Sequence, residues 1–225
     1  MKKIQVLAVL IGMCVFAGPS MAQGIESGQS VVDFYLGAGS ALQKSGMEVD
    51  GQNLSWGKVG ADAGISYLYF SSPYLGIGAD IHYAGFQGSE SFEDVPGRWH
   101  WHTFDTDFEM STLHVMGIGR INLNPDSPVR IYLPFGAGIA LSKGSMKYIW
   151  DNYEIYQAEN YDSSFSWYAG IGVEFETNNG FAWGIEARYN AFEHNYKDLS
   201  YLVGGHIVDT NPERNYISLV LKAQF

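Results

Sequence analysis

The sequence predicts an all-β chain that folds as an eight-stranded antiparallel up-and-down transmembrane β-barrel. Three observations predict it. After residue 22, segments of about ten residues alternate apolar and polar side chains with a period of two. Short turns and long loops alternate between these segments. The last segment ends on Phe225, and the alternate residues before it are all apolar, namely Ile217, Leu219, Leu221 and Ala223.

The first 22 residues have the pattern of a secretory signal peptide. Two lysines precede an apolar run over residues 4–17, and Ala22 completes a cleavage pattern of small residues. We expect cleavage between Ala22 and Gln23, which leaves residues 23–225 as the barrel domain. A lipoprotein with Cys14 as its lipid-bearing residue is an alternative, but the residues before Cys14 match a lipobox poorly.

Composition narrows the class of protein further. The mean hydropathy of −0.09 excludes several apolar helical membrane spans, and aromatic residues make up 15% of the chain. Cys14 is the one cysteine, so the chain without its signal has no disulfide and no thiolate chemistry. With a net charge of −11, the chain is not expected to bind nucleic acid.

The alternation places eight strands in order along the chain. We expect them at approximately 31–42, 56–70, 75–87, 107–123, 129–141, 163–176, 181–193 and 214–225. The sixth strand shows the pattern most clearly, because one face carries Phe165, Trp167, Ala169, Ile171, Val173 and Phe175. The second, fifth and seventh strands alternate in the same way, with their charged residues on the opposite face.

The two faces of the strands have different surroundings. An Arg or Lys at the bilayer midplane costs about 2–4 kcal/mol, so the apolar face should meet lipid and the polar face should line the lumen. A soluble lipocalin-like barrel is the alternative, but that class of barrel has the opposite arrangement.

The connections predict the orientation of the barrel. The turns at 71–74, 124–128 and 177–180 are short, whereas the loops at 43–55, 88–106, 142–162 and 194–213 are long. Short turns belong on the periplasmic side, so we expect both termini in the periplasm and the long loops outside the cell. We also expect the two middle loops, 88–106 and 142–162, to protrude as hairpins.

The closing strand, residues 216–225, resembles that of the small outer-membrane β-barrels of OmpA and OmpX type in Gram-negative bacteria. The resemblance covers the whole chain after the signal, without a periplasmic domain. It implies a monomer in the outer membrane, surrounded by membrane lipid and lipopolysaccharide. It also implies that the barrel assembly machinery recognises the terminal row Ile217, Leu219, Leu221, Ala223 and Phe225.

Charged residues gather on the predicted lumen face. The set comprises Asp33, Lys58, Asp62, Asp80, Arg120, Arg130, Glu174, Glu186, Arg188 and Lys222, with Glu176, His82 and His114 nearby. An eight-stranded interior is just wide enough for side chains to fill it. We therefore expect a salt-bridged polar plug, and the alternative is a narrow, gated conduction path through it.

The long middle loops are rich in aromatic residues. Trp99 and Trp101 lie in one loop, and Tyr148, Trp150 and Tyr153 lie in the other. Tyr and Trp supply rigid contact area, so these residues are candidates for contact with an extracellular protein or glycan. The alternative is that they pack over the barrel mouth. His100 and His102 are too few for a metal site, so we expect no metal and no cofactor.

The predicted function is a structural or surface-interaction role through the extracellular loops. The alternative is a narrow, low-conductance channel for small solutes. We expect no enzyme. A lipid A deacylase would need a His-x-Ser pair, and Tyr196 stands where the serine after His194 should be. A palmitoyl transferase would need a hollow, apolar interior.

Overall fold

The computed structural model describes residues 24–42, 47–49, 52–53, 59–93, 103–150, 153–177, 181–194, 207–209 and 213–225. Within these residues, all regular secondary structure is β-strand. No helix among them has the length and apolar character needed to cross a membrane. The predicted signal peptide at 1–22 and its cleavage site lie outside the described residues.

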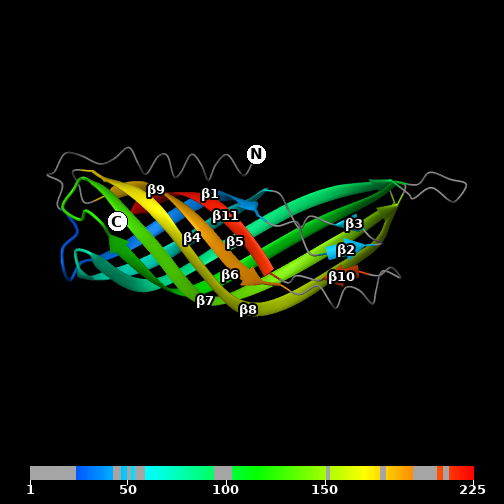
Figure 1. Ribbon diagram of the computed structural model, residues 1–225, viewed down its shortest axis with the longest axis horizontal. Helices are drawn as coiled ribbons and strands as arrows, with labels where there is room; N and C mark the ends of the chain where they lie inside the picture. The colour runs from blue at the N-terminus through cyan, green and yellow to red at the C-terminus, as the bar shows by residue number, and fades with distance from the viewer. Residues whose placement is uncertain are drawn as a thin grey trace, which may run out of the picture.

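Eight long strands form a closed barrel (Figure 1). They are β1 (Ser30–Ala41), β4 (Val59–Ser72), β5 (Leu75–Glu93), β6 (Thr103–Asn122), β7 (Val129–Trp150), β8 (Tyr153–Glu176), β9 (Ala182–Glu193) and β11 (Glu213–Gln224). Each strand pairs antiparallel with the barrel strand next to it in sequence, and β1 pairs with both β4 and β11 to close the ring. The predicted fold class is confirmed.

The short turns at one end of the barrel are held by their own side chains. Asn124 lies between β6 and β7, and its Nδ2 donates to the carbonyl of Val129 at 2.7 Å. The amide of Ile131 donates to Asn124 Oδ1 at 2.6 Å. An Asn side chain can replace backbone partners in a tight turn. This single residue therefore fixes the reversal between the two strands.

The strands differ greatly in length, and the four middle ones exceed the predicted bounds. β1, β9 and β11 have 12 residues each, whereas β7 has 22 and β8 has 24. The loops predicted at 88–106 and 142–162 are therefore largely strand, and both form the expected hairpins. In Figure 1 the strands β5–β8 run on beyond the ends of β1, β9 and β11.

The first and last long loops also contain strands, which the sequence did not predict. β2 (Met47–Val49), β3 (Gln52–Asn53) and β10 (Ile207–Asp209) form a three-stranded antiparallel sheet of order β10-β2-β3. The prediction of loops at 43–55 and 194–213 was therefore incomplete. The strands are two or three residues long, which is too short for a period-two pattern to appear in the sequence.

Apolar side chains cover the outside of the barrel. On β7, the outward row includes Val129, Ile131, Leu133, Phe135 and Ile139, all of which are exposed. At the level of these rows the charged residues point inward, since Arg120 on β6, Arg130 on β7 and Glu174 on β8 are all buried. This arrangement is the reverse of a soluble barrel and matches a lipid environment.

The apolar outer surface ends at a definite level on β5–β8. Tyr83, Leu113 and Leu141 form one outward row across β5, β6 and β7, and all three are exposed. Four residues further along the strands, the outward row is Gln87, Glu109 and Ser145. We place the edge of the apolar band on the side of the long hairpins between these two rows.

The interior has apolar layers as well as charges, which the prediction of a salt-bridged polar plug did not include. One layer contains Val31, Leu68, Phe70, Met116 and Ile118 with Tyr168, and Ile25 packs into it from the N-terminal segment. A second layer contains Ala84, Phe86, Met110, Ala140, Phe192 and Tyr216. On the inward face of the strands, these apolar residues lie among polar ones. They therefore form no continuous apolar row in the sequence, unlike the residues of the outer face.

The N-terminal segment depends on a glycine. Gly28 has a φ of 88°, and its amide donates to the carbonyl of Phe70 at 2.8 Å. We expect Gly28→Ala to lower the free energy of unfolding by about 1–2 kcal/mol, because a Cβ disfavours this backbone conformation. Urea unfolding followed by tryptophan fluorescence would measure it. Glu26→Ala, an exposed change in the same segment, is the control, and an equal loss in both variants would contradict the argument.

Candidate functional site inside the barrel

Inward-facing positions bring the predicted charged residues together inside the barrel. The nine that the structure describes are all buried, namely Asp33, Asp62, Asp80, Arg120, Arg130, Glu174, Glu186, Arg188 and Lys222. They come from all eight barrel strands, β1, β4, β5, β6, β7, β8, β9 and β11. Lys58 lies outside the described residues.

One cluster is centred on Glu174. Arg120 donates to it through Nη1 at 2.7 Å and Nη2 at 3.1 Å, which is a bidentate contact. Arg130 donates to Glu174 Oε1 through Nη2 at 2.6 Å and also pairs with Glu176. The guanidinium of Arg120 lies over the ring of Tyr132 at 3.9 Å. The two acids and two arginines therefore neutralise one another within a buried group.

A second cluster is centred on Glu186. This carboxylate pairs with Arg188 and accepts a hydrogen bond of 2.8 Å from Tyr132 Oη. Lys222 Nζ lies 2.8 Å from Asp33 and 3.8 Å from Glu186, so it links the two acids. Because Tyr132 contacts both Arg120 and Glu186, it joins this cluster to the first one.

A third group contains the histidines. His82 Nδ1 lies 2.6 Å from Asp80 Oδ2, and Tyr35 Oη donates to both oxygens of Asp80. The ring of His82 stacks on His114, with centroids 4.2 Å apart. His114 Nδ1 lies 2.9 Å from Ser166 Oγ. The group links four strands through hydrogen bonds and ring stacking.

The sequence did not single out the residues that complete these clusters. Tyr35 and Tyr132 hold carboxylates, and Asn122 accepts from Arg120 Nε at 2.7 Å. Gln224 donates to Asp33 Oδ1 at 2.9 Å. The alternation of the strands could have identified these four residues, because all of them occupy the inward face of a strand. Their residue types alone could not, because many surface residues are of the same types.

The structure gives His194 a serine partner that the sequence motif did not contain. Ser142 Oγ lies 2.6 Å from His194 Nδ1, although the two residues belong to distant parts of the chain. Both side chains are buried, so the serine oxygen is not open to a lipid substrate on the outer face. The described residues give no positive evidence of catalysis, and no group of three or more metal-binding side chains occurs among them.

The predicted assembly row lies on the outside of β11. Ile217, Leu219, Leu221 and Phe225 are exposed, and Ala223 is half-buried. Phe225 closes the barrel, because its backbone exchanges two 3.0 Å hydrogen bonds with Val32. Its ring also packs edge-on against Phe181 of the neighbouring turn. The recognition of this row by the assembly machinery stays a prediction.

The candidate loop residues are only partly described. Tyr148 and Trp150 lie at the end of β7, and Tyr153 opens β8, so all three belong to the end of one hairpin. Trp99 and Trp101 lie outside the described residues. The sequence therefore placed the first three correctly at the end of a protruding hairpin, and their role in binding stays a prediction.

Comparisons with solved structures find similar chains at low identity. One is Neisserial surface protein A, at 14% identity over 87% of this chain and 94% of that chain with a TM-score of 0.45. Another is OprG from Pseudomonas aeruginosa, at 11% identity over 88% and 97% with a TM-score of 0.46. A third is Ail, the attachment invasion locus protein of Yersinia pestis, at 17% identity over 89% and 100% with a TM-score of 0.40.

A search of curated proteins found no match. The family model described as "Outer membrane protein beta-barrel domain" matches residues 7–225, which is nearly the whole chain. This match agrees with the closed eight-stranded barrel and with the apolar outer surface. The chain therefore belongs to the outer membrane protein β-barrel family.

Proposed function

We propose that this chain is a cell-surface interaction barrel, in which β5–β8 carry a binding surface beyond the outer membrane. The short turns and both termini then face the periplasm, and the hairpins face outside, as in other barrels of this class. The partner is an extracellular protein that offers an extended segment. The observation that carries the proposal is the edge of β8 that no other strand pairs with among the described residues.

This edge follows from the unequal strand lengths. The ladder between β8 and β9 begins at Ser166 and Phe192 and runs toward the periplasmic turn. Beyond it, Ser164 Oγ donates to the carbonyl of Glu193 at 2.7 Å, and this side-chain contact ends the pairing. Among the described residues, β8 has no ladder partner on that side over residues 153–165.

An uncovered strand edge can bind another chain. Its free N–H and C=O groups are a template for an added strand, and proteins usually shorten or cover such edges. Here residues 153–159 lie past the level at which the outer surface becomes polar, because Glu159 pairs with Ser145, so that part of the edge is not covered by lipid. The aromatic residues at the end of the hairpin, Tyr148, Trp150 and Tyr153, would add contact area to the same surface.

A shortened hairpin tests the proposal. Gly144 and Asn160 are paired across β7 and β8, so residues 145–159 can be replaced by an Asn-Gly turn with the register kept. The control shortens the other hairpin at the Gly88–Phe108 pair. Linear peptides selected from a phage library on the parent protein in nanodiscs are expected to lose at least tenfold in affinity with the first variant only.

Hydrogen exchange gives the second readout. Peptide binding should slow amide exchange over residues 153–165, because an added strand protects the backbone. Peptides that bind both shortened variants as tightly as the parent, or that leave this exchange unchanged, would refute the proposal. If the partner were a glycan, its binding would not protect the backbone amides of residues 153–165 in this way.

The narrow channel remains the alternative function. Two apolar layers and the clusters around Glu174 and Glu186 lie along the interior, so an ion would have to displace buried side chains. Planar-bilayer recording would decide between the functions. Discrete conductance steps that Glu186→Gln or Arg188→Gln abolishes would favour the channel over the interaction barrel.

A further inference from the structure

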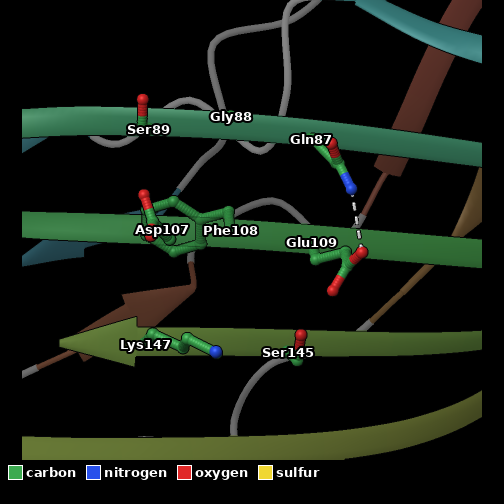
Figure 2. A pocket seen from close by; sticks show the side chains of 8 residues that line it. All are labelled: Gln87, Gly88, Ser89, Asp107, Phe108, Glu109, Ser145 and Lys147. Carbon is green, nitrogen blue, oxygen red and sulfur yellow. Dashed lines mark hydrogen bonds between the residues drawn. The ribbon is translucent and has the colours of Figure 1, made fainter. Parts of the chain in front are cut away.

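Three hollows overlap on the outward surface of β5–β8. The hollow nearest the ends of the long hairpins, which we call the upper one, has a volume of about 440 Å³. It is lined by Gln87, Ser89, Asp107, Glu109, Ser145 and Lys147 (Figure 2). The middle one, about 500 Å³, shares Gln87, Glu109 and Ser145 with it. The lower one, about 550 Å³, shares Tyr83, Ser111 and Lys143 with the middle one. Together they form one groove, which we call the β5–β8 groove.

The chemistry of the β5–β8 groove changes along its length. Its lower part contains Leu113 and Leu141, which belong to the last row of the apolar band. Its upper part is polar, and Figure 2 shows side chains of three neighbouring strands around it, with Gln87 Nε2 donating to Glu109 at 2.9 Å. Gly85 lies between the two parts. Because it has no side chain, the middle of the groove is open.

This gradient matches an amphiphile that stands upright in the membrane. The acyl chains would lie against the apolar end, and the headgroup would lie in the polar end. The exposed rings of Tyr83 and Tyr161 flank the transition, and hydroxyl, amide and carboxylate groups line the region above. Exposed tyrosine rings with convergent hydroxyl and carboxylate groups suit a sugar headgroup better than a small glycerol phosphate.

We propose that the β5–β8 groove binds one lipopolysaccharide molecule of the outer leaflet through its phosphorylated sugar headgroup. The carboxylates of Asp107 and Glu109 accept hydrogen bonds from sugar hydroxyls, and the ammonium groups of Lys143 and Lys147 face the phosphates. The proposal rests on the orientation given under the proposed function, but it does not depend on the open edge of β8.

The charge of Lys143 fits this role. Its Nζ lies 2.8 Å from Glu159 and 5.5 Å from the centre of the Tyr161 ring. The hydrogen bond to Glu159 raises the pKa of Lys143 and lowers the pKa of Glu159, so both groups are charged at neutral pH. Both side chains remain partly exposed, so the ammonium can still reach a phosphate.

Two glycines give a matched pair of variants. A Cβ at Gly85 would lie 3.4 Å from the Tyr83 ring, and one at Gly117 would lie 3.9 Å from its nearest neighbour, so both sites accept a side chain. Gly85→Leu fills the middle of the groove, whereas Gly117→Leu places the same side chain outside it, on the lipid face. Heat-modified gel mobility would show that both variants fold.

The experiment measures binding of rough lipopolysaccharide to the protein in phosphocholine micelles by native mass spectrometry. The parent and Gly117→Leu should bind one molecule, and Gly85→Leu should bind at least tenfold more weakly. Lys147→Gln should weaken binding of phosphorylated but not of dephosphorylated lipopolysaccharide. Equal binding by Gly85→Leu and the parent, or equal binding of phosphatidylglycerol and lipopolysaccharide, would overturn the proposal.

A labelling experiment separates this proposal from the orientation on which it rests. Asp126→Cys places a thiol on the exposed short turn between β6 and β7, away from the groove. A membrane-impermeant maleimide should label it in lysed cells but not in intact cells. This result without lipopolysaccharide binding would refute the groove alone, whereas labelling in intact cells would refute the orientation and the groove together.

Discussion

Replacing Glu174 with leucine is expected to lower the free energy of unfolding by about 3–5 kcal/mol, because it leaves buried charge without a partner. Glu174 accepts four hydrogen bonds from Arg120 and Arg130, and all three side chains are almost completely buried. Arg130 would keep its pair with Glu176, so the loss falls mainly on Arg120. Urea titration of the protein folded in lipid vesicles would measure the change.

Two further variants define the source of the loss. Arg120→Leu combined with Glu174→Leu should recover part of it, because the double variant removes both charges. Glu159→Leu is the surface control. It breaks an exposed pair with Lys143, and such pairs contribute little to stability. If Glu174→Leu cost no more than Glu159→Leu, the buried cluster would not stabilise the barrel.

Placing an arginine on the lipid face is expected to have the next largest effect. Val115 is exposed on β6, between Ile81 and Ile139 in the outward apolar row. We expect Val115→Arg to lower the free energy of unfolding in lipid vesicles by about 2–4 kcal/mol, since the charge enters the hydrocarbon region. Tryptophan fluorescence during urea titration would report the change.

The control for this variant lies on the same strand and the same face. Glu109 is six residues nearer the hairpin and above the edge of the apolar band, so Glu109→Arg should cost at most about 1 kcal/mol. A similar cost for both variants would mean that the band edge does not lie between the Leu113 and Glu109 rows.

Local patterns in the sequence were enough to predict the barrel. The side chains of a strand alternate between two faces whatever strand lies beside it, so a row such as Ile217, Leu219 and Leu221 identifies the lipid face by itself. Turn residues such as Asn124 likewise act over a few positions. These features indicated the number of barrel strands, their connections and the inward direction of the lumen charges.

Local patterns of this kind could not predict which side chains of different strands contact one another. Glu174 and Arg120 meet because the pairing registers of β6, β7 and β8 bring them to one level, although the residues are far apart in the chain. The sequence offered six acids and five bases without saying which would pair. It also did not reveal Tyr132, which bridges two clusters, or Ser142, which bonds His194.

The sequence by itself determined that this protein is a transmembrane barrel, which face of each strand meets lipid and which residues point inward, because side-chain direction is a local property of a strand. Only the tertiary structure decided which inward charges neutralise one another, where apolar layers interrupt them, and how far β5–β8 extend beyond the membrane. Those features depend on the register between strands distant in sequence, and register is fixed only when all eight strands close the ring.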